Sequence, residues 1–268
     1  MLETLSANAI LMTTLSRLAE EMILWSSYEF GTLTLDDGFA MGSSMMPQKK
    51  NPGTLELLRG RSGRMNGLLV AGLTMMKGLP SGYNRDFHEE KEVLVESLDL
   101  INRAIEIIPA LIQSTQINKE RMAKLAEGNF STATELANYL VREKAVPFRK
   151  AHHVVGSLVG KLSRSGQTFS NLEVCAQHLK ECELEMSQSE LTRVLDPKQV
   201  MLSYKATGST APEPVSKMLT DFKTRLNQHQ EKLNQDQKRV DRAFETCKKI
   251  ATAATSMNLR ECVREYLA

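Results

Sequence analysis

Apolar residues recur at helical spacing through the first 115 residues, and this periodicity constrains the fold more than any other feature. Between residues 2 and 27 the apolar series runs from Leu2 to Leu24, and neither Gly nor Pro interrupts it. No alternation of period two, which would indicate strands, occurs in these 115 residues. The sequence therefore predicts an all-α protein whose first part is a bundle of long helices.

A second long helix is expected to begin just after Asn51-Pro52, because Pro suits the first helical turn and Asn is a good N-cap. It runs to about Lys77, and Gly78-Leu79-Pro80 ends it. Four glycines inside it predict a close approach to neighbouring helices: Gly60, Gly63, Gly67 and Gly72.

A third helix is expected over residues 85–115, where Pro109 either kinks or divides it. Shorter elements follow, at about 118–127, 132–144, 148–163, 170–182 and 187–194, and a charged helical stretch covers 215–265. We therefore predict two domains. Residues 1–115 form a bundle of long helices, and residues 116–268 form a small helical domain with a charged tail.

Composition and charge are those of a soluble globular protein with small-molecule chemistry. The chain has 268 residues and a formal net charge of +2, so no nucleic-acid partner is implied. Charged residues interrupt the apolar N-terminal run, and no long uncharged apolar stretch exists, so neither a signal peptide nor a membrane partner is expected. The four cysteines form no C-x-x-C pair, which favours reduced thiols in a cytoplasmic protein.

The loop over residues 42–52 carries the strongest chemical signal. Its Gly-Ser-Ser start can bring backbone N–H groups and hydroxyls close to a ligand, and Lys49 and Lys50 add positive charge. Asn51 can donate an amide hydrogen bond beside a helix N-terminus, where the helix dipole also favours anions. From the residues alone, an anion pocket and a solvated surface loop are about equally supported. The spacing is not that of a P-loop.

This stretch closely resembles the signature of the fumarase/aspartase superfamily, G-S-S-x-M-P-x-K-x-N-P, at every fixed position. The resemblance implies anti elimination that releases fumarate, with a base removing the proton next to a carboxylate. It assigns the base to Ser43 and stabilisation of the dianionic intermediate to Lys49 and Asn51. Ser44 and Gln48 are assigned to substrate binding.

The same resemblance assigns Glu56, about one and a half turns into the second helix, to orienting the catalytic acid, a histidine. It implies no cofactor. A Ser alkoxide is unfavourable in water, so the assigned base requires positive charge and N–H donors around it.

Residues 78–92 resemble a segment of the argininosuccinate lyases, K-G-L-P-x-x-Y-N-[KR]-D-x-Q-E-D-K-E. In that family the Tyr, the Gln and the last Lys contact the substrate, which assigns substrate binding to Tyr83, His88 and Lys91. The family Gln is replaced by His88, and this departure leaves room for a different N-succinyl substrate.

The resemblance continues through residues 131–140, 146–152 and 195–213 and covers roughly residues 2–220. His152 and His153 are interpreted as structural, because no carboxylate–histidine cluster at ligand spacing indicates a metal.

Family members are longer than this chain, and their N-terminal region supplies the acid His and further substrate contacts. The resemblance therefore implies that residues 1–115 are the C-terminal half of the family's central helical-bundle domain and that residues 116–268 include its small C-terminal domain. The resemblance implies a homotetramer in which three subunits build each active site, acting on argininosuccinate, fumarate and arginine. The chain alone is therefore expected to be inactive. The alternatives are a lyase for another succinyl compound, a crystallin-like structural oligomer, and a helical interaction protein built on the charged tail.

Overall fold

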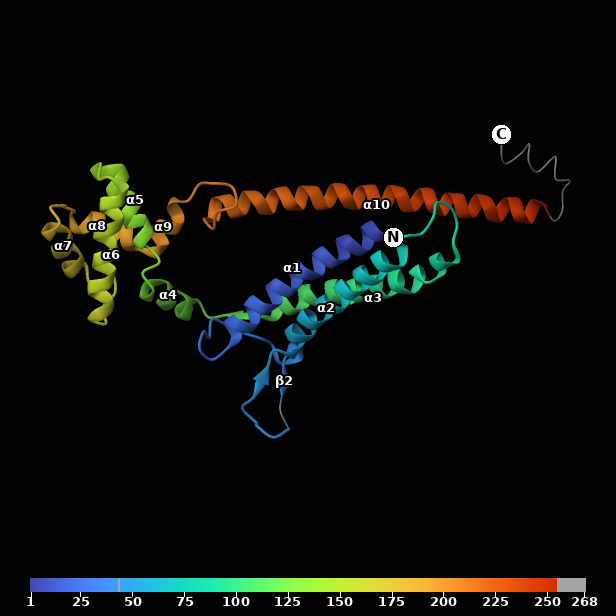
Figure 1. The fold of residues 1–268 in the computed structure, drawn as a ribbon, viewed down its shortest axis with the longest axis horizontal. Coiled ribbons are helices and arrows are strands. Elements are labelled where there is room, and N and C mark those ends of the chain that lie inside the picture. Colours follow the sequence, from blue (N-terminus) through green and yellow to red (C-terminus); the bar gives the residue numbers. More distant parts are fainter. Residues whose placement is uncertain (43, 255–268) are drawn as a thin grey trace. The chain divides into compact units, whose positions relative to one another are not determined.

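The computed structural model describes residues 1–42 and 44–254, and the protein is all-α (Figure 1). The chain divides into two compact units, Met1–Asn129 and the residues from Phe130 on. Among the described residues, no helix is both long and apolar enough to cross a membrane.

Three long helices form the first unit and pack against one another: α1 (Leu2–Ser26), α2 (Gly53–Met76) and α3 (Glu90–Ser114). A shorter helix, α4 (Lys119–Gly128), follows. The core between them is filled by flexible and branched side chains that are almost fully buried, among them Met12, Leu55, Met65, Leu100 and Leu111. The three predicted long helices are confirmed.

The predicted close approach at the α2 glycines is confirmed at Gly72. A Cβ atom there would lie 2.7 Å from Leu5 Cδ1, so only Gly lets α1 come this near to α2. At Gly60, Gly63 and Gly67 an added Cβ would meet no atom within 4 Å, which leaves their face of α2 open in the described part of one chain.

One detail of the predicted helices is wrong, and the structure decides another for which two alternatives were open. Asn51 does not cap α2, because it lies in a short strand and Pro52 occupies the N-cap position without a side-chain hydrogen bond. Pro109 does not divide the third helix, since α3 continues through it to Ser114.

Short strands occur in a region for which the sequence showed no strand pattern. β1 (Leu33–Thr34) pairs antiparallel with β4 (Gln116–Ile117), and β2 (Met41–Gly42) pairs antiparallel with β3 (Lys50–Asn51). Strands of two residues are too short to produce an alternating pattern. The 3₁₀ turns η1 (Asp37–Phe39) and η2 (Arg85–His88) complete the first unit.

The contacts around β4 explain where the first compact unit ends. Besides the pairing of β4 with β1, the Arg121 guanidinium donates to the carbonyl oxygens of Phe30 (3.0 Å) and Glu29 (2.9 Å). These bonds tie β4 and α4 to the end of α1, so this unit extends beyond residue 115 to Asn129.

Six helices follow among the described residues of the second unit: α5 (Ala133–Lys144), α6 (Phe148–Arg164), α7 (Leu172–Glu181), α8 (Gln188–Leu195), α9 (Pro197–Ser203) and α10 (Pro212–Ala254). Fully buried leucines from α5 to α8 form their core: Leu136, Leu140, Leu158, Leu162, Leu179 and Leu191. Cys175 lies in this core, where burial raises the pKa of its thiol to about 11.

Helix α9 is absent from the predicted elements, although its start signal is present. Asp196 accepts a hydrogen bond from Lys198 N at 2.9 Å as the N-cap, and Pro197 occupies the first turn. The predicted helix over 215–265 is confirmed as α10 up to residue 254, and residues 255–268 lie outside the described part.

Candidate active site

A hairpin presents the signature loop. Met41 pairs with Asn51 and Gly42 with Lys50 in the β2–β3 ladder, so residues 44–49 lie in a loop closed at its base (Figure 1). Ser43, the assigned base, lies outside the described residues, immediately after the last residue of β2. The arrangement brings Ser44, Gln48 and the Asn51 backbone onto one hairpin beside the start of α2.

A tight turn shapes the tip of this hairpin. The Lys49 amide donates to the Met46 carbonyl oxygen at 3.0 Å, which closes a four-residue turn with Pro47 in its second position. Pro favours this position because its ring fixes φ near the value that the turn requires. Ser44, Gln48 and Lys49 are all exposed, so their polar groups are open to a ligand.

The two lysines of the loop have different environments. Lys50 Nζ forms an ion pair with Asp37 Oδ1 at 2.6 Å, and the hydrogen bond from Lys50 holds the pKa of the Asp37 carboxyl below its usual range. Within the described residues Lys49 makes no ion pair, so its charge remains available to an anionic substrate. Sequence reasoning missed the role of Asp37, for which the only signal was the run Asp36-Asp37-Gly38.

A glycine lets the hairpin rest on the start of α2. A Cβ atom on Gly53 would lie 2.4 Å from Met41 Sδ and 2.6 Å from Met41 Cγ. The Met41 side chain therefore occupies the space that any larger residue at position 53 would need. One turn further, Glu56 is exposed on the first turn of α2, and its side chain makes no hydrogen bond or ion pair with the described residues.

A second cluster of assigned residues lies between α2 and α3. Tyr83 Oη and His88 Nε2 are 2.6 Å apart, and the Tyr83 ring also stacks on Phe87 with centroids 6.4 Å apart. Lys91 follows at the start of α3 and is exposed. Tyr83 is also exposed, so the hydrogen-bonded pair is accessible to a ligand.

The two clusters lie at opposite ends of α2. This helix has 24 residues, and at 1.5 Å per residue it is about 36 Å long. The hairpin residues precede its first turn, whereas Tyr83, His88 and Lys91 follow its last turn. Within one chain the structure therefore does not bring the two groups of assigned residues together.

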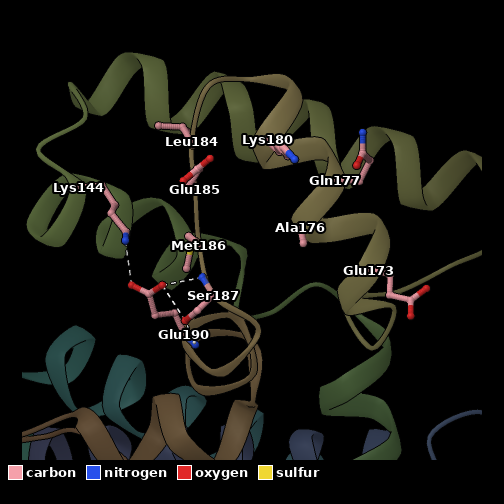
Figure 2. A pocket seen from close by; sticks show the side chains of 10 residues that line it. All are labelled: Lys144, Glu173, Ala176, Gln177, Lys180, Leu184, Glu185, Met186, Ser187 and Glu190. Atoms are coloured by element: carbon pink, nitrogen blue, oxygen red, sulfur yellow. Dashed lines mark hydrogen bonds and ion pairs between the residues drawn. The ribbon is translucent and has the colours of Figure 1, made fainter.

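A hollow of about 590 Å³ lies in the second unit and contains none of the assigned residues (Figure 2). On its wall the Glu190 carboxylate accepts hydrogen bonds from Lys144 Nζ at 2.9 Å and the Ser187 amide at 2.7 Å. It also accepts a hydrogen bond from Tyr139 Oη at 2.7 Å. These donors, led by Lys144, hold the pKa of Glu190 well below its usual range. We interpret the network as structural, because it joins α5 to the capping box of α8.

Two family models match this chain, one within each of its two compact units. Residues 1–67, which include the hairpin, match the family described as Lyase, and residues 130–201 match the family described as Argininosuccinate lyase C-terminal. A curated argininosuccinate lyase of Methanocaldococcus jannaschii is 38% identical over 244 residues, which are 91% of this chain and 50% of that protein.

The chain belongs to the argininosuccinate lyase family.

Further relatives agree with this membership. The argininosuccinate lyase of Bacillus licheniformis is 43% identical over 226 residues, which are 84% of this chain and 48% of that protein. Among solved structures, a variant of EDDS lyase with bound fumarate is 28% identical, with a TM-score of 0.75, and the match covers 98% of this chain and 51% of the other. The chain spans about half the length of the argininosuccinate lyases that it matches.

Proposed function

We propose that this chain supplies part of the active site of an argininosuccinate lyase, which cleaves argininosuccinate to arginine and fumarate in arginine biosynthesis in the cytoplasm. Family membership supports the reaction class, and the match over residues 1–67 includes the hairpin with the superfamily signature. The reaction is an anti elimination: a base removes a proton next to a carboxylate, and the C–N bond to the leaving group then breaks. No cofactor takes part in this scheme.

In this proposal Ser43 is the base, and Lys49 and Asn51 stabilise the dianionic intermediate. The exposed Lys49, which has no ion pair among the described residues, supports an electrostatic role, because its charge is not neutralised by a neighbour. The N-terminus of α2 adds a positive dipole end beside Asn51. Preorganised positive charge stabilises the intermediate more than the substrate and so lowers the barrier.

The remaining assignments concern orientation and binding. Ser44 and Gln48 bind substrate from the same exposed hairpin, and Tyr83, His88 and Lys91 bind it from the segment between α2 and α3. Glu56, whose exposed side chain makes no hydrogen bond or ion pair among the described residues, orients the acid His of another segment.

One observation carries the proposal beyond family membership: the two clusters of assigned residues are separated by the whole length of α2, about 36 Å. A single substrate cannot contact both ends of this helix. The proposed active site therefore combines the hairpin of one subunit with the Tyr83 segment of another, in a homotetramer. The exposed apolar side chains along α3 support such packing, among them Val95, Leu98, Ile105 and Ile112.

A second candidate is a lyase of the same superfamily that acts on a different succinyl compound. His88 stands where the family has Gln, and its Nε2 is held 2.6 Å from Tyr83 Oη, so one of the assigned substrate contacts is already engaged. The similarity to EDDS lyase is in keeping with this alternative. A competition assay, in which one enzyme preparation receives argininosuccinate together with another succinyl amine, would show which substrate is cleaved preferentially and so separate the two candidates.

The experiment measures fumarate release from argininosuccinate by a polypeptide of the printed sequence, alone and mixed with an N-terminal fragment of a related lyase. We expect activity only in the mixture, because the acid and part of the substrate contacts are assigned to other segments, and we expect Ser43→Ala to abolish it. Activity of the polypeptide alone would refute the divided site. A mixture that assembles yet stays inactive on every succinyl substrate would favour a structural, crystallin-like oligomer.

A further inference from the structure

Helix α10 carries a seven-residue repeat that the lyase reaction does not use. It contains 43 residues, which makes it about 65 Å long (Figure 1). Apolar residues recur every seven positions in one series, Leu219, Leu226, Leu233 and Val240. Three positions after each of them runs a second series, Phe222, His229, Asp236 and Ala243. These are the a and d positions of a coiled-coil heptad.

The apolar stripe is not covered by the other described residues of the second unit. Leu226 is 67% exposed and Leu233 is 61% exposed, although both lie at the centre of the stripe. Most helices in proteins are stabilised by packing an apolar face, and a long helix with such a face in water indicates a missing partner. The repeat identifies the partner as another helix, because only a second helix matches a period of seven over this length.

The residues beside the stripe carry one sign of charge. The e and g positions between residues 223 and 239 hold no acidic residue and four basic ones: Lys223, Arg225, Lys232 and Arg239. Of these four, only Arg239 has an ion pair among the described residues, with Asp236 at 3.4 Å. The flanks therefore complement a helix with Glu or Asp at its own e and g positions.

Pairing of α10 with a second copy of itself is unfavourable in both orientations. In a parallel pair, Asp236 would face Asp236 across the core, and Arg225 and Lys232 would face Gln230 and Gln237 instead of acids. In an antiparallel pair, the basic g positions would face one another and repel.

A membrane surface is also a poor match for this face. A helix that lies on a bilayer buries its apolar side among acyl chains. Here Asp236 and His229 lie in the middle of that side, where an acidic residue is expensive to bury in lipid. In a coiled coil, polar core positions specify register and partner at a cost in stability, so the layers of His229 and Asp236 select a partner that matches them.

We propose that α10 docks an acidic amphipathic helix of another protein as a heteromeric coiled coil. The partner helix carries Leu or a similar residue at its core positions, Glu or Asp at its flanks, and a Lys or Arg opposite Asp236. This proposal does not rest on the lyase reaction, and it assigns α10 an interaction role whether or not the chain is catalytically active.

The test uses the full 268-residue chain and two synthetic helical peptides with identical leucine cores. Both peptides have a Lys opposite Asp236; one has Glu at its e and g positions, and the control has Lys at the same e and g positions. Binding is measured by the fluorescence anisotropy of labelled peptide. We expect the acidic peptide to bind and the basic control to bind at least tenfold more weakly, with the preference decreasing as salt is raised.

Two double charge reversals, on opposite sides of α10, test which face of the helix binds the peptide. Arg225→Glu with Lys232→Glu changes the flanks, and Lys217→Glu with Lys238→Glu makes the same charge change on the opposite side of the helix. We expect the first pair to weaken acidic-peptide binding about tenfold, since each exposed pair contributes about a factor of two and its reversal costs a similar factor. The second pair should change binding by less than about twofold. Circular dichroism confirms that α10 remains helical in both variants.

Three results would overturn the proposal. Equal binding of the acidic and basic peptides would show that the basic e and g positions of α10 do not select an acidic helix. Self-association of the chain in sedimentation, lost on Leu233→Asp, would assign the stripe to a second copy. Binding of α10 to phosphatidylserine vesicles without binding of the acidic peptide would assign it to a membrane surface.

Discussion

Gly53→Ala should loosen the signature hairpin without unfolding the protein. An added Cβ would lie 2.4 Å from Met41 Sδ, closer than real side-chain contacts allow, so the Met41 side chain must move away from α2. Gly53 is the first residue of α2, and a helical backbone accepts Ala without strain. The substitution therefore acts on the contact that rests β2 on the helix.

The magnitude follows from the exposure of Met41. Its side chain is 50% exposed, so displacement loses about half of the 2–3 kcal/mol that full burial of a Met side chain contributes, or about 1 kcal/mol. Ala gains up to about 1 kcal/mol of helix propensity over Gly in α2. The free energy of global unfolding should therefore change little, while local opening of the β2–β3 ladder becomes about 1 kcal/mol easier, or about fivefold more frequent.

Hydrogen exchange of the backbone amides in residues 41–42 and 50–51 measures this opening directly. Gly60→Ala is the matched control, because it makes the same change in the same helix with no atom within 4 Å of the new Cβ. In a Met41→Ala background, Gly53→Ala should add nothing, since the clashing side chain has gone. Equal exchange rates in Gly53→Ala, Gly60→Ala and the unchanged protein would refute the idea that Met41 anchors the hairpin.

Three further predictions follow from the two units. His88→Gln should raise kcat/KM for argininosuccinate over other succinyl substrates, and steady-state kinetics of the assembled enzyme would show it; an unchanged ratio would remove His88 as a specificity determinant. Leu162→Ala should lower stability by about 2–5 kcal/mol in urea unfolding because the side chain is fully buried, whereas Leu202→Ala, at an exposed position, should stay within about 0.5 kcal/mol. The depressed pKa of Glu190 means that its stabilising contribution is complete above about pH 4.5 and is lost as the pH falls below that value. Glu190→Gln should therefore lower Tm at pH 7 and flatten the loss of stability in acid, and an unchanged acid profile would contradict the role of this carboxylate.

Much of the helical fold could be predicted because it depends on local signals. The apolar period of α1 and the uninterrupted charged stretch of α10 are visible in the sequence, and both helices are where they were expected. The predicted N-cap of α2 is wrong because the prediction rests on the local preference of Asn51 for N-cap positions. The pairing of β3 with β2 places this residue in a strand instead. The sequence analysis predicts no helix directly after residue 194, although Asp196-Pro197 is a helix start signal and begins α9.

The candidate site could be predicted only in part, for a similar reason. Family motifs assign roles to residues such as Lys49 and Tyr83, but their separation by the length of α2 depends on tertiary structure. The ion pair of Lys50 with Asp37 joins residues 13 positions apart through a hairpin whose register no propensity determines. The bond between Tyr83 and His88 depends on the 3₁₀ turn that brings the two side chains to the same side.

Subunit mixing tests the divided active site most directly. Lys49→Ala disables the hairpin and Lys91→Ala disables the other cluster, so each variant, assembled with the N-terminal lyase fragment, should be inactive alone. If one site combines segments of different subunits, mixed oligomers of the two variants should regain about a quarter of the active sites by random assembly. Recovered fumarate release in the mixture is the result that the proposal predicts. A mixture as inactive as its two components, with mixed oligomers present in sedimentation, would contradict it.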